Sequence, residues 1–188
     1  MLNFYRINSV SDPLFEKLYN LYATAFSPSE RRSWSALEHE LTYEKRFHVH
    51  ALLKNDHFVG FFNYWVFERF YYIEHFAVTS KLRDQQIGSE AMEIFKNQVK
   101  LPILFEVEMP NDPIAVRRIR FYERLGFTVL SHYYAQPPYD GNGFLLPELI
   151  MCNDVHFANT HFELIKATLY DKVYHYKSLS DRISAVDD

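Results

Sequence analysis

The sequence predicts one domain of the α/β (α+β) class, in which a mixed sheet is flanked by helices. Stretches rich in β-branched and aromatic residues alternate with stretches whose apolar residues recur at helical spacing. The chain has 188 residues, a length that suits a single domain. Hydrophobic residues make up 48% of the chain and charged residues 23%, which is ordinary for a globular protein and excludes a disordered one.

The predicted elements begin with a strand at 2–7. A helix follows that starts at Asp12 and Pro13, because a capping residue with proline just inside is a typical helix start. Ser33 is the predicted cap of a second helix at 34–43. The apolar residues of both helices recur at helical spacing.

Two β-rich runs, at 47–53 and 58–67, come next. Asn55 and Asp56 lie between them and favour a hairpin, because both residue types tolerate a positive φ. Further strands are predicted at 71–79, 101–108, 127–134 and 144–152. Helices are predicted from about 87 to 99, from 112 to 125 (followed by Gly126, as suits a left-handed helix end) and from 153 to 176. The last helix has an apolar stripe made of Ala158, Phe162, Ile165, Leu169, Val173 and Tyr176.

Charge and composition narrow the classes of partner. The net charge is −4, which argues against nucleic acid because phosphate binding favours a basic surface. No apolar run approaches the roughly 20 residues that span a bilayer, and no signal peptide is visible. Cys152 is the sole cysteine and is interpreted as a buried small hydrophobe. We therefore expect a cytoplasmic protein with no membrane or nucleic-acid partner.

The segment 72–88 carries the clearest functional pattern. A strand runs into a polar loop, and the loop opens an amphipathic helix. A helix N-terminus presents unpaired N–H groups and a partial positive charge, so it favours a phosphate group. Gly88 lets the backbone approach an anion, Ser89 adds a hydroxyl and Arg83 adds a cation. The alternative is a plain helix start with a solvated Arg83.

A second pattern lies on the helix predicted at 112–125. This helix carries four arginines and Tyr122, and it is followed by Gly126 and Phe127. Most of the arginines are interpreted as a solvated helix face. The spacing of Tyr122 alone indicates a core aromatic side chain, with a catalytic hydroxyl as the alternative.

Together these patterns resemble the GNAT superfamily of N-acetyltransferases. The acetyl-CoA signature of that family is Arg/Gln-x-x-Gly-x-Gly/Ala after a strand ending in Ala-Val, and this chain has Ala77-Val78 and then Arg83-Asp-Gln-Gln-Ile-Gly-Ser89. A later helix matches in Phe121-Tyr-Glu-Arg-Leu-Gly-Phe127. The resemblance implies a GNAT-like domain at 1–152 with a mostly antiparallel sheet, and a C-terminal helical extension at 153–188 packed on the same domain.

The resemblance implies transfer of an acetyl group from acetyl-CoA, as co-substrate, to a primary amine of a small molecule or peptide by direct attack. Much of the rate gain would then come from proximity and orientation. No metal is expected. The residues implied in cofactor binding are Phe76, Ala77, Val78, Arg83, Asp84, Gln85, Gln86, Ile87, Gly88, Ser89 and Asn111.

The resemblance also implies that Tyr122 acts as general acid toward the departing thiolate. For the general base, Glu74 is the first choice, on a strand that is expected to place residues 72, 74 and 76 on one face. Glu106, Glu108 and His75 are alternatives. Glu74 has an alternative role of its own, as a carboxylate paired with an arginine or lysine.

Two questions stay open at this point. Gln86 stands where the signature has its first glycine, so a non-catalytic acyl-CoA or small-ligand binding module is the alternative function. In the acceptor region, Arg31 and Arg32 are candidates to bind an acceptor carboxylate. Tyr133, Tyr134 and Tyr139 are candidates to stack on the acceptor, and a solvated loop is the alternative for all five. A homodimer formed through the last helix is compatible with either function.

Overall fold

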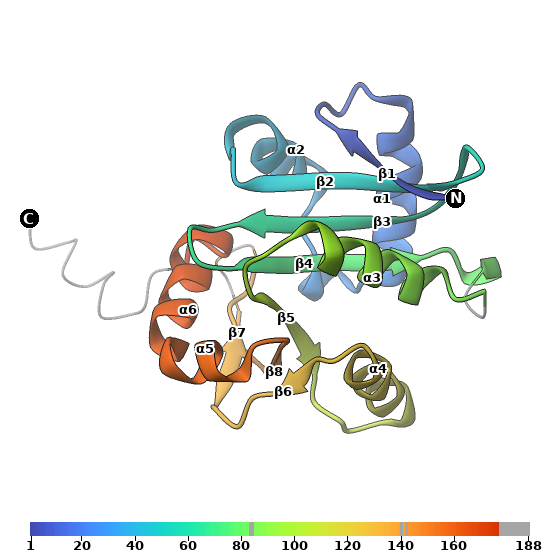
Figure 1. The fold of residues 1–188 in the computed structure, drawn as a ribbon. Helices are drawn as coiled ribbons and strands as arrows, with labels where there is room; N and C mark the ends of the chain where they lie inside the picture. Colours follow the sequence, from blue (N-terminus) through green and yellow to red (C-terminus); the bar gives the residue numbers. More distant parts are fainter. Residues whose placement is uncertain (83–84, 140, 142, 177–188) are drawn as a thin grey trace, which may run out of the picture.

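The computed structural model describes residues 1–82, 85–139, 141 and 143–176, and these contain one eight-stranded sheet with helices on both faces (Figure 1). In chain order the elements are β1 (Leu2–Ile7), α1 (Pro13–Ala25), η1 (Pro28–Glu30), α2 (Trp34–Tyr43), β2 (Phe47–Lys54), β3 (His57–Val66), β4 (Tyr71–Val78), η2 (Ser80–Leu82), α3 (Ile87–Gln98), β5 (Ile103–Glu108), α4 (Pro113–Arg124), β6 (Thr128–Val129), β7 (Tyr134–Gln136), β8 (Leu146–Cys152), α5 (Val155–Thr160), α6 (Phe162–Thr168) and η3 (Leu169–Val173).

The sheet is mixed and largely antiparallel, as predicted. Its order is β1-β2-β3-β4-β5-β8-β6, and β7 also pairs with β8. Only β4 and β5 run parallel to each other among the described strands. The parallel pair is joined through α3, as a parallel connection requires a crossover.

Each face of the sheet has its own hydrophobic core. Helices α1 and α2 lie behind the sheet in Figure 1, and their buried Phe15, Leu18 and Leu37 share one core with residues of α5, α6 and η3. Helices α3 and α4 cover the opposite face, where Phe95 and Ile119 are buried. The C-terminal helices therefore belong to the same layer as the N-terminal ones.

Local sequence chemistry explains the element boundaries that were predicted. The Asp12 carboxylate accepts a hydrogen bond from the Leu14 N–H at 2.9 Å, and Ser33 caps α2 through the Ala36 N–H at 3.2 Å. Asn55 and Asp56 form the turn of the β2–β3 hairpin with φ of 50° and 63°. These caps and this hairpin are confirmed.

The predicted strand at 127–134 is wrong as a continuous element. Val129 pairs with Met151 of β8, whereas Tyr134 pairs with Glu148. The chain advances five residues from Val129 to Tyr134 while β8 advances only three, from Met151 to Glu148. The segment between β6 and β7 therefore bulges away from β8. Such an irregularity bends the strand and aims its later side chains differently.

The single helix predicted at 153–176 is also wrong. The segment divides into α5, α6 and the π-helical turn η3, with a break at His161, whose φ and ψ are −114° and 19°. The predicted stripe is buried from Ala158 to Val173, but Tyr174 rather than Tyr176 is buried at its end. The π turn contains one residue more than an α-helical turn, so it rotates the following side chains.

Candidate active site

Strands β4 and β5 separate near the middle of the sheet. They pair only from Tyr71–Ile103 to Ile73–Phe105, although β4 continues to Val78 and β5 to Glu108. Glu74 is the first residue of β4 past the last pair. Its side chain is 0% exposed while the residue as a whole is partly exposed, so its backbone is what faces the opening. The separation leaves backbone groups of β4 free for a ligand.

A β-bulge lies at the same position of β4. Asn63 pairs with His75 and Tyr64 with Ile73, which leaves Glu74 as the extra residue. Because of this insertion, Phe76 contacts the core of the α3 face, whereas Tyr72 belongs to the core of the α1 face. The prediction that residues 72, 74 and 76 share one face is therefore wrong at Phe76, since a bulge reverses the alternation.

Both carboxylate oxygens of Glu74 accept hydrogen bonds from buried donors. Arg32 Nε donates to Oε1 at 2.9 Å and Trp65 Nε1 donates to Oε2 at 2.7 Å. This is the arrangement that the sequence offered as the alternative to catalysis.

Arg32 is itself buried and fully engaged. One terminal nitrogen donates to Glu40 at 3.1 Å, the other to the Val173 carbonyl at 2.6 Å, and the guanidinium lies over the Tyr139 ring at 4.9 Å. Both sequence interpretations of Arg32, an acceptor-carboxylate ligand and a solvated loop residue, are therefore wrong. Arg31 is partly exposed, but its side chain donates to the Phe26 carbonyl at 3.2 Å.

His75 is a buried neutral imidazole. Burial lowers its pKa, so the neutral form prevails at neutral pH. Its Nε2 lies 2.9 Å from the Glu30 carbonyl, an acceptor, so Nε2 carries the proton. Its Nδ1 then accepts from the Tyr22 hydroxyl, 3.4 Å away. Both ring nitrogens are thus directed to protein groups.

An acidic cavity of about 60 Å³ opens where β4 and β5 separate. It is lined by Phe26, Glu30, Glu74, His75, Glu106, Val107, Glu108, Arg118, Gln136, Tyr139 and Glu148. Five of these residues are glutamates. Arg32 neutralises Glu74, and Arg118 forms an ion pair with Glu108. The Glu30 carboxylate and the ionised form of Glu106 leave the charge balance of the cavity negative, which favours a cationic ligand.

Glu106 is one of the carboxylates that line this cavity, one residue past the last β4–β5 pair. The hydroxyls of Tyr134 and Tyr174 both donate to it. Burial raises the pKa of Glu106 to about 7, although these hydrogen bonds lower it. Burial raises the pKa of Glu148 to about 9, and the nearby Glu106 adds to the effect, so Glu148 keeps its proton at neutral pH. Glu106, with a pKa near neutrality, is suited to accept and release protons.

Tyr122 lies on the α4 side of the opening. Its ring packs on Phe105 of β5 at 4.3 Å between centroids and on Phe121 and Phe127. Burial raises its pKa to about 12, so its hydroxyl keeps its proton at neutral pH. Among the described residues, none forms a hydrogen bond with that hydroxyl. Its proton is therefore available to a ligand.

The start of α3, like that of α6, has no side-chain cap. Side chains of Asp12, Ser33, Asp112 and Asp154 cap α1, α2, α4 and α5, but no side chain caps α3. Its first helical bond joins the Glu90 N–H to the Gln86 carbonyl, so the N–H groups of residues 87–89 have no helical acceptor. This helix start is suited to bind phosphate.

Gln86 adopts the left-handed conformation, with φ of 59° and ψ of 9°. This is the backbone shape that glycine adopts most readily, which explains how the loop keeps its form without one. A Cβ on Gly88 would lie 3.4 Å from Phe121 and 3.7 Å from Phe76, in ordinary contact. Gln85 is exposed, and Arg83 and Asp84 lie outside the described residues.

The remaining residues singled out from the sequence do not line the acidic cavity. Asn111 is exposed in the turn before α4 and lines a shallow hollow with Arg117, Arg120 and Arg124. Tyr133 is 74% exposed. Cys152 is buried, as interpreted from the sequence.

Sequence reasoning missed three features of the cavity: the burial of Arg32, the contribution of Glu148, and the donation from Tyr174. No periodic pattern indicates them, because their partners come from distant parts of the chain. The sequence did indicate Tyr134 as a candidate residue, but for stacking on the acceptor and not for its hydrogen bond to Glu106.

Comparisons with known proteins agree with this geometry. The model of the acetyltransferase (GNAT) family matches residues 15–127. A GNAT-family acetyltransferase from Bacteroides thetaiotaomicron has 35% sequence identity and a TM-score of 0.88, over 93% of this chain and 99% of that one. Among curated proteins no sequence match is found.

Two more distant structures share the fold. The ribosomal-protein-S18-alanine N-acetyltransferase from Escherichia coli has a TM-score of 0.58 and 18% identity, over 82% of this chain and 94% of that one. A GNAT acetyltransferase from Elizabethkingia anophelis with acetyl-CoA bound has a TM-score of 0.53 and 14% identity, over 80% and 95%.

The separated parallel strands and the uncapped helix beside them define a GNAT-type acyltransferase fold. The chain belongs to the GNAT family of acetyltransferases. It is thus an N-acetyltransferase. In the described part of the chain, no helix has both the length and the apolar character needed to cross a membrane.

Proposed function

We propose that the protein transfers an acetyl group from acetyl-CoA to a cationic primary amine, presented by a small molecule or a peptide end. The observation that carries this proposal is the acidic cavity at the point where β4 and β5 separate. Its volume of about 60 Å³ is that of roughly two waters, so it suits an unbranched aminomethyl group. Glutamates on its wall favour an ammonium over a neutral or anionic group.

In this proposal acetyl-CoA, which supplies the acetyl group as an activated thioester, would lie along the end of β4 and the start of α3. Residues 76–78 of β4 lie beyond the last β4–β5 pair and would hold the pantetheine arm by backbone groups. The first N–H groups of α3, at Ile87, Gly88 and Ser89, would hold the pyrophosphate. Arg83, Asp84, Gln85 and Gln86 precede this position in the sequence. The role of Asn111 is less direct, since it lies in the turn before α4.

For the general base we propose Glu106 in place of Glu74. The carboxylate of Glu74 is held by Arg32 and Trp65, so a positioning role suits it better. Glu106 lines the cavity and is partly exposed to it. With a pKa raised to about 7 by burial, it would accept the proton from the acceptor ammonium, because its basicity is closer to that of the amine. Glu108 is held by Arg118, and both nitrogens of His75 are directed to protein groups.

Tyr122 keeps the role of general acid in this proposal. Its hydroxyl retains a proton at neutral pH and has no acceptor among the described residues. It would donate that proton to the departing sulfur. A backbone N–H of β4 near Val78 would polarise the carbonyl that is attacked.

The test is a matched series of amines with detection of released thiol. Straight-chain diamines, monoamines and ω-amino acids of equal length differ in the charge at the far end. We expect kcat/KM to be highest for the diamines and lowest for the amino acids, by tenfold or more. A preference for the amino acids would contradict the acidic cavity as acceptor site. Saturable acetyl-CoA binding without thiol release from any amine would instead support the non-catalytic alternative.

A further inference from the structure

The chain after β8 reaches into the active-site region. The Val173 carbonyl accepts from Arg32 at 2.6 Å, and His175 Nε2 lies 2.8 Å from Glu40. The Tyr174 hydroxyl donates to Glu106. Three successive residues of the C-terminal segment thus contact the groups around the acidic cavity.

The π turn η3 is what directs Tyr174 inward. The Tyr174 N–H donates to the Leu169 carbonyl, five residues earlier, at 3.1 Å. An α-helix continued from α6 would place residue 176 over the core, in phase with Leu169 and Val173. With the wider turn, Tyr174 is 2% exposed and Tyr176 only partly buried. Single π turns inside helices are frequent at functional sites.

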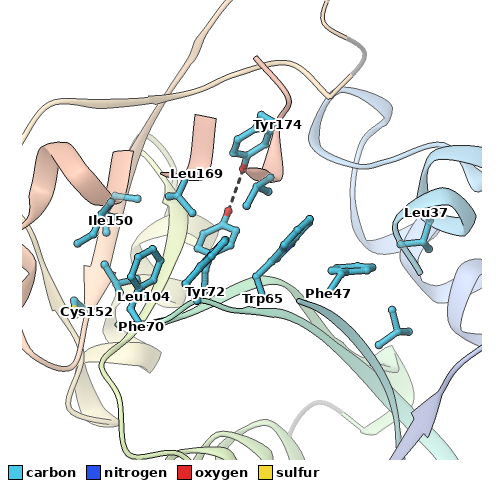
Figure 2. Close-up of a cluster of buried hydrophobic side chains, with 14 of the residues drawn as sticks. Leu37, Phe47, Trp65, Phe70, Tyr72, Leu104, Ile150, Cys152, Leu169 and Tyr174 are labelled. Atoms are coloured by element: carbon cyan, nitrogen blue, oxygen red, sulfur yellow. Dashed lines mark hydrogen bonds between the residues drawn. The ribbon is translucent and has the colours of Figure 1, made fainter. Parts of the chain in front are cut away.

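The hydroxyls of Tyr72 and Tyr174 point toward one another, 3.0 Å apart (Figure 2). A hydroxyl has one proton to donate, and that of Tyr174 goes to Glu106. Tyr72 can then donate either to Tyr174 or to Glu106 itself, whose pKa a hydrogen bond from Tyr72 also lowers. Tyr72 of β4 and Tyr174 of the C-terminal segment therefore meet at Glu106, and Tyr134 of β7 donates to the same carboxylate.

We propose that Tyr174 is a positioning residue of the active site, which orients the Glu106 carboxylate and stabilises its ionised form. The C-terminal segment then completes the acetyltransferase site. This inference rests on the proposed role of Glu106. A hydrogen bond to a carboxylate stabilises the charged form relative to the protonated one, and a donor that is itself fixed by Tyr72 loses little freedom in making it.

The test compares Tyr174→Phe with Tyr170→Phe. Tyr170 lies one turn earlier, and its hydroxyl donates to the Ala135 carbonyl at 2.6 Å, so its replacement removes a comparable hydrogen bond away from Glu106. We expect Tyr174→Phe to move the acid limb of the kcat/KM profile upward by about one pH unit, with the KM for acetyl-CoA unchanged. Tyr170→Phe should leave the limb in place. An unmoved limb in Tyr174→Phe, or an equal shift in both variants, would overturn the proposal.

A second readout does not depend on turnover. The carboxyl ¹³C signal of Glu106 is identified by its loss in Glu106→Gln and is titrated in the intact protein. Tyr174→Phe should raise its midpoint, and 3-fluorotyrosine at position 174, a stronger donor that keeps the side-chain shape, should lower it. An unchanged midpoint in the fluorinated protein would contradict the proposal even if Tyr174→Phe failed to fold. If Glu106→Gln keeps full turnover while these midpoints move, the role of Glu106 as base fails and the contact with Tyr174 stands.

Discussion

Arg32 Nε donates to Glu74 Oε1 at 2.9 Å in the interior, and neither side chain is more than 3% exposed. The pair joins the loop after η1 to the bulge of β4, and through Glu40 and Val173 it also holds α2 and the C-terminal segment. Of these parts, the bulge of β4 borders the acidic cavity through Glu74. The ion pair thus fixes one wall of the cavity, which is the acceptor site in the function proposed above.

Replacing Arg32 by Met should destabilise the fold strongly. The substitution leaves the Glu74 and Glu40 carboxylates buried without their cation, and breaking a buried pair costs about 3–5 kcal/mol. Urea unfolding measures this loss. Arg46→Met is the matched control, because Arg46 is 39% exposed in its pair with Glu44, and surface pairs contribute at most about 1 kcal/mol. Equal losses in the two variants would contradict a stabilising role specific to the buried pair.

The helix starts and the hairpin were predictable because their chemistry is local. The Asp12 cap and the Asn55-Asp56 turn each depend on two to four adjacent residues. The bulge at Glu74 and the π turn at 169–173 were not predictable, because each inserts one residue into a regular repeat without a local signal. Each insertion changes the direction of the side chains that follow it.

For the candidate site, the sequence indicated the elements better than the roles. The strand at 71–79, the start of α3 and Tyr122 were all located correctly along the chain. The partners of Glu74 and Glu106 were not, because Arg32, Tyr134 and Tyr174 approach them from far along the chain. The sequence indicates which carboxylates lie near the separation of β4 and β5. Their hydrogen-bond partners, which only the structure shows, decide which carboxylate can accept a proton.

Catalysis should depend on one carboxylate that titrates near neutrality. Burial raises the pKa of Glu106, so its proton-accepting form is lost as the pH falls through about 7. We expect kcat/KM to decrease about tenfold per pH unit below that value. Glu106→Gln should lower turnover by a factor of about 10²–10⁴ and remove this limb. Glu93→Gln, an exposed glutamate of α3, is the control and should keep the full profile. If the acid limb of the kcat/KM profile persists in Glu106→Gln, another residue is the general base.

Removing the Tyr122 hydroxyl should affect chemistry rather than binding. Tyr122→Phe keeps the ring that packs on Phe105, so acetyl-CoA affinity measured by calorimetry should not change. Loss of the proton donor should lower kcat by about 10²–10⁴. Tyr64→Phe provides the comparison, since Tyr64 is also partly buried on the α3 face and its pKa is also raised by burial. Turnover equal to wild type in Tyr122→Phe would exclude this hydroxyl from the mechanism.

Gln86 and Gly126 both have a positive φ, so exchanging glycine and a larger residue should change stability in opposite directions at the two positions. Gln86→Gly removes the cost of a side chain at φ of 59°, so stability should rise by up to about 1 kcal/mol and acetyl-CoA affinity should not fall. Gly126→Ala introduces that cost at φ of 85°, where a Cβ would meet only Lys96 Nζ at 4.0 Å, so stability should fall by about 1 kcal/mol. Thermal unfolding and calorimetry measure both variants. A tenfold weaker Kd for acetyl-CoA in Gln86→Gly would mean that the glutamine side chain itself contacts the co-substrate.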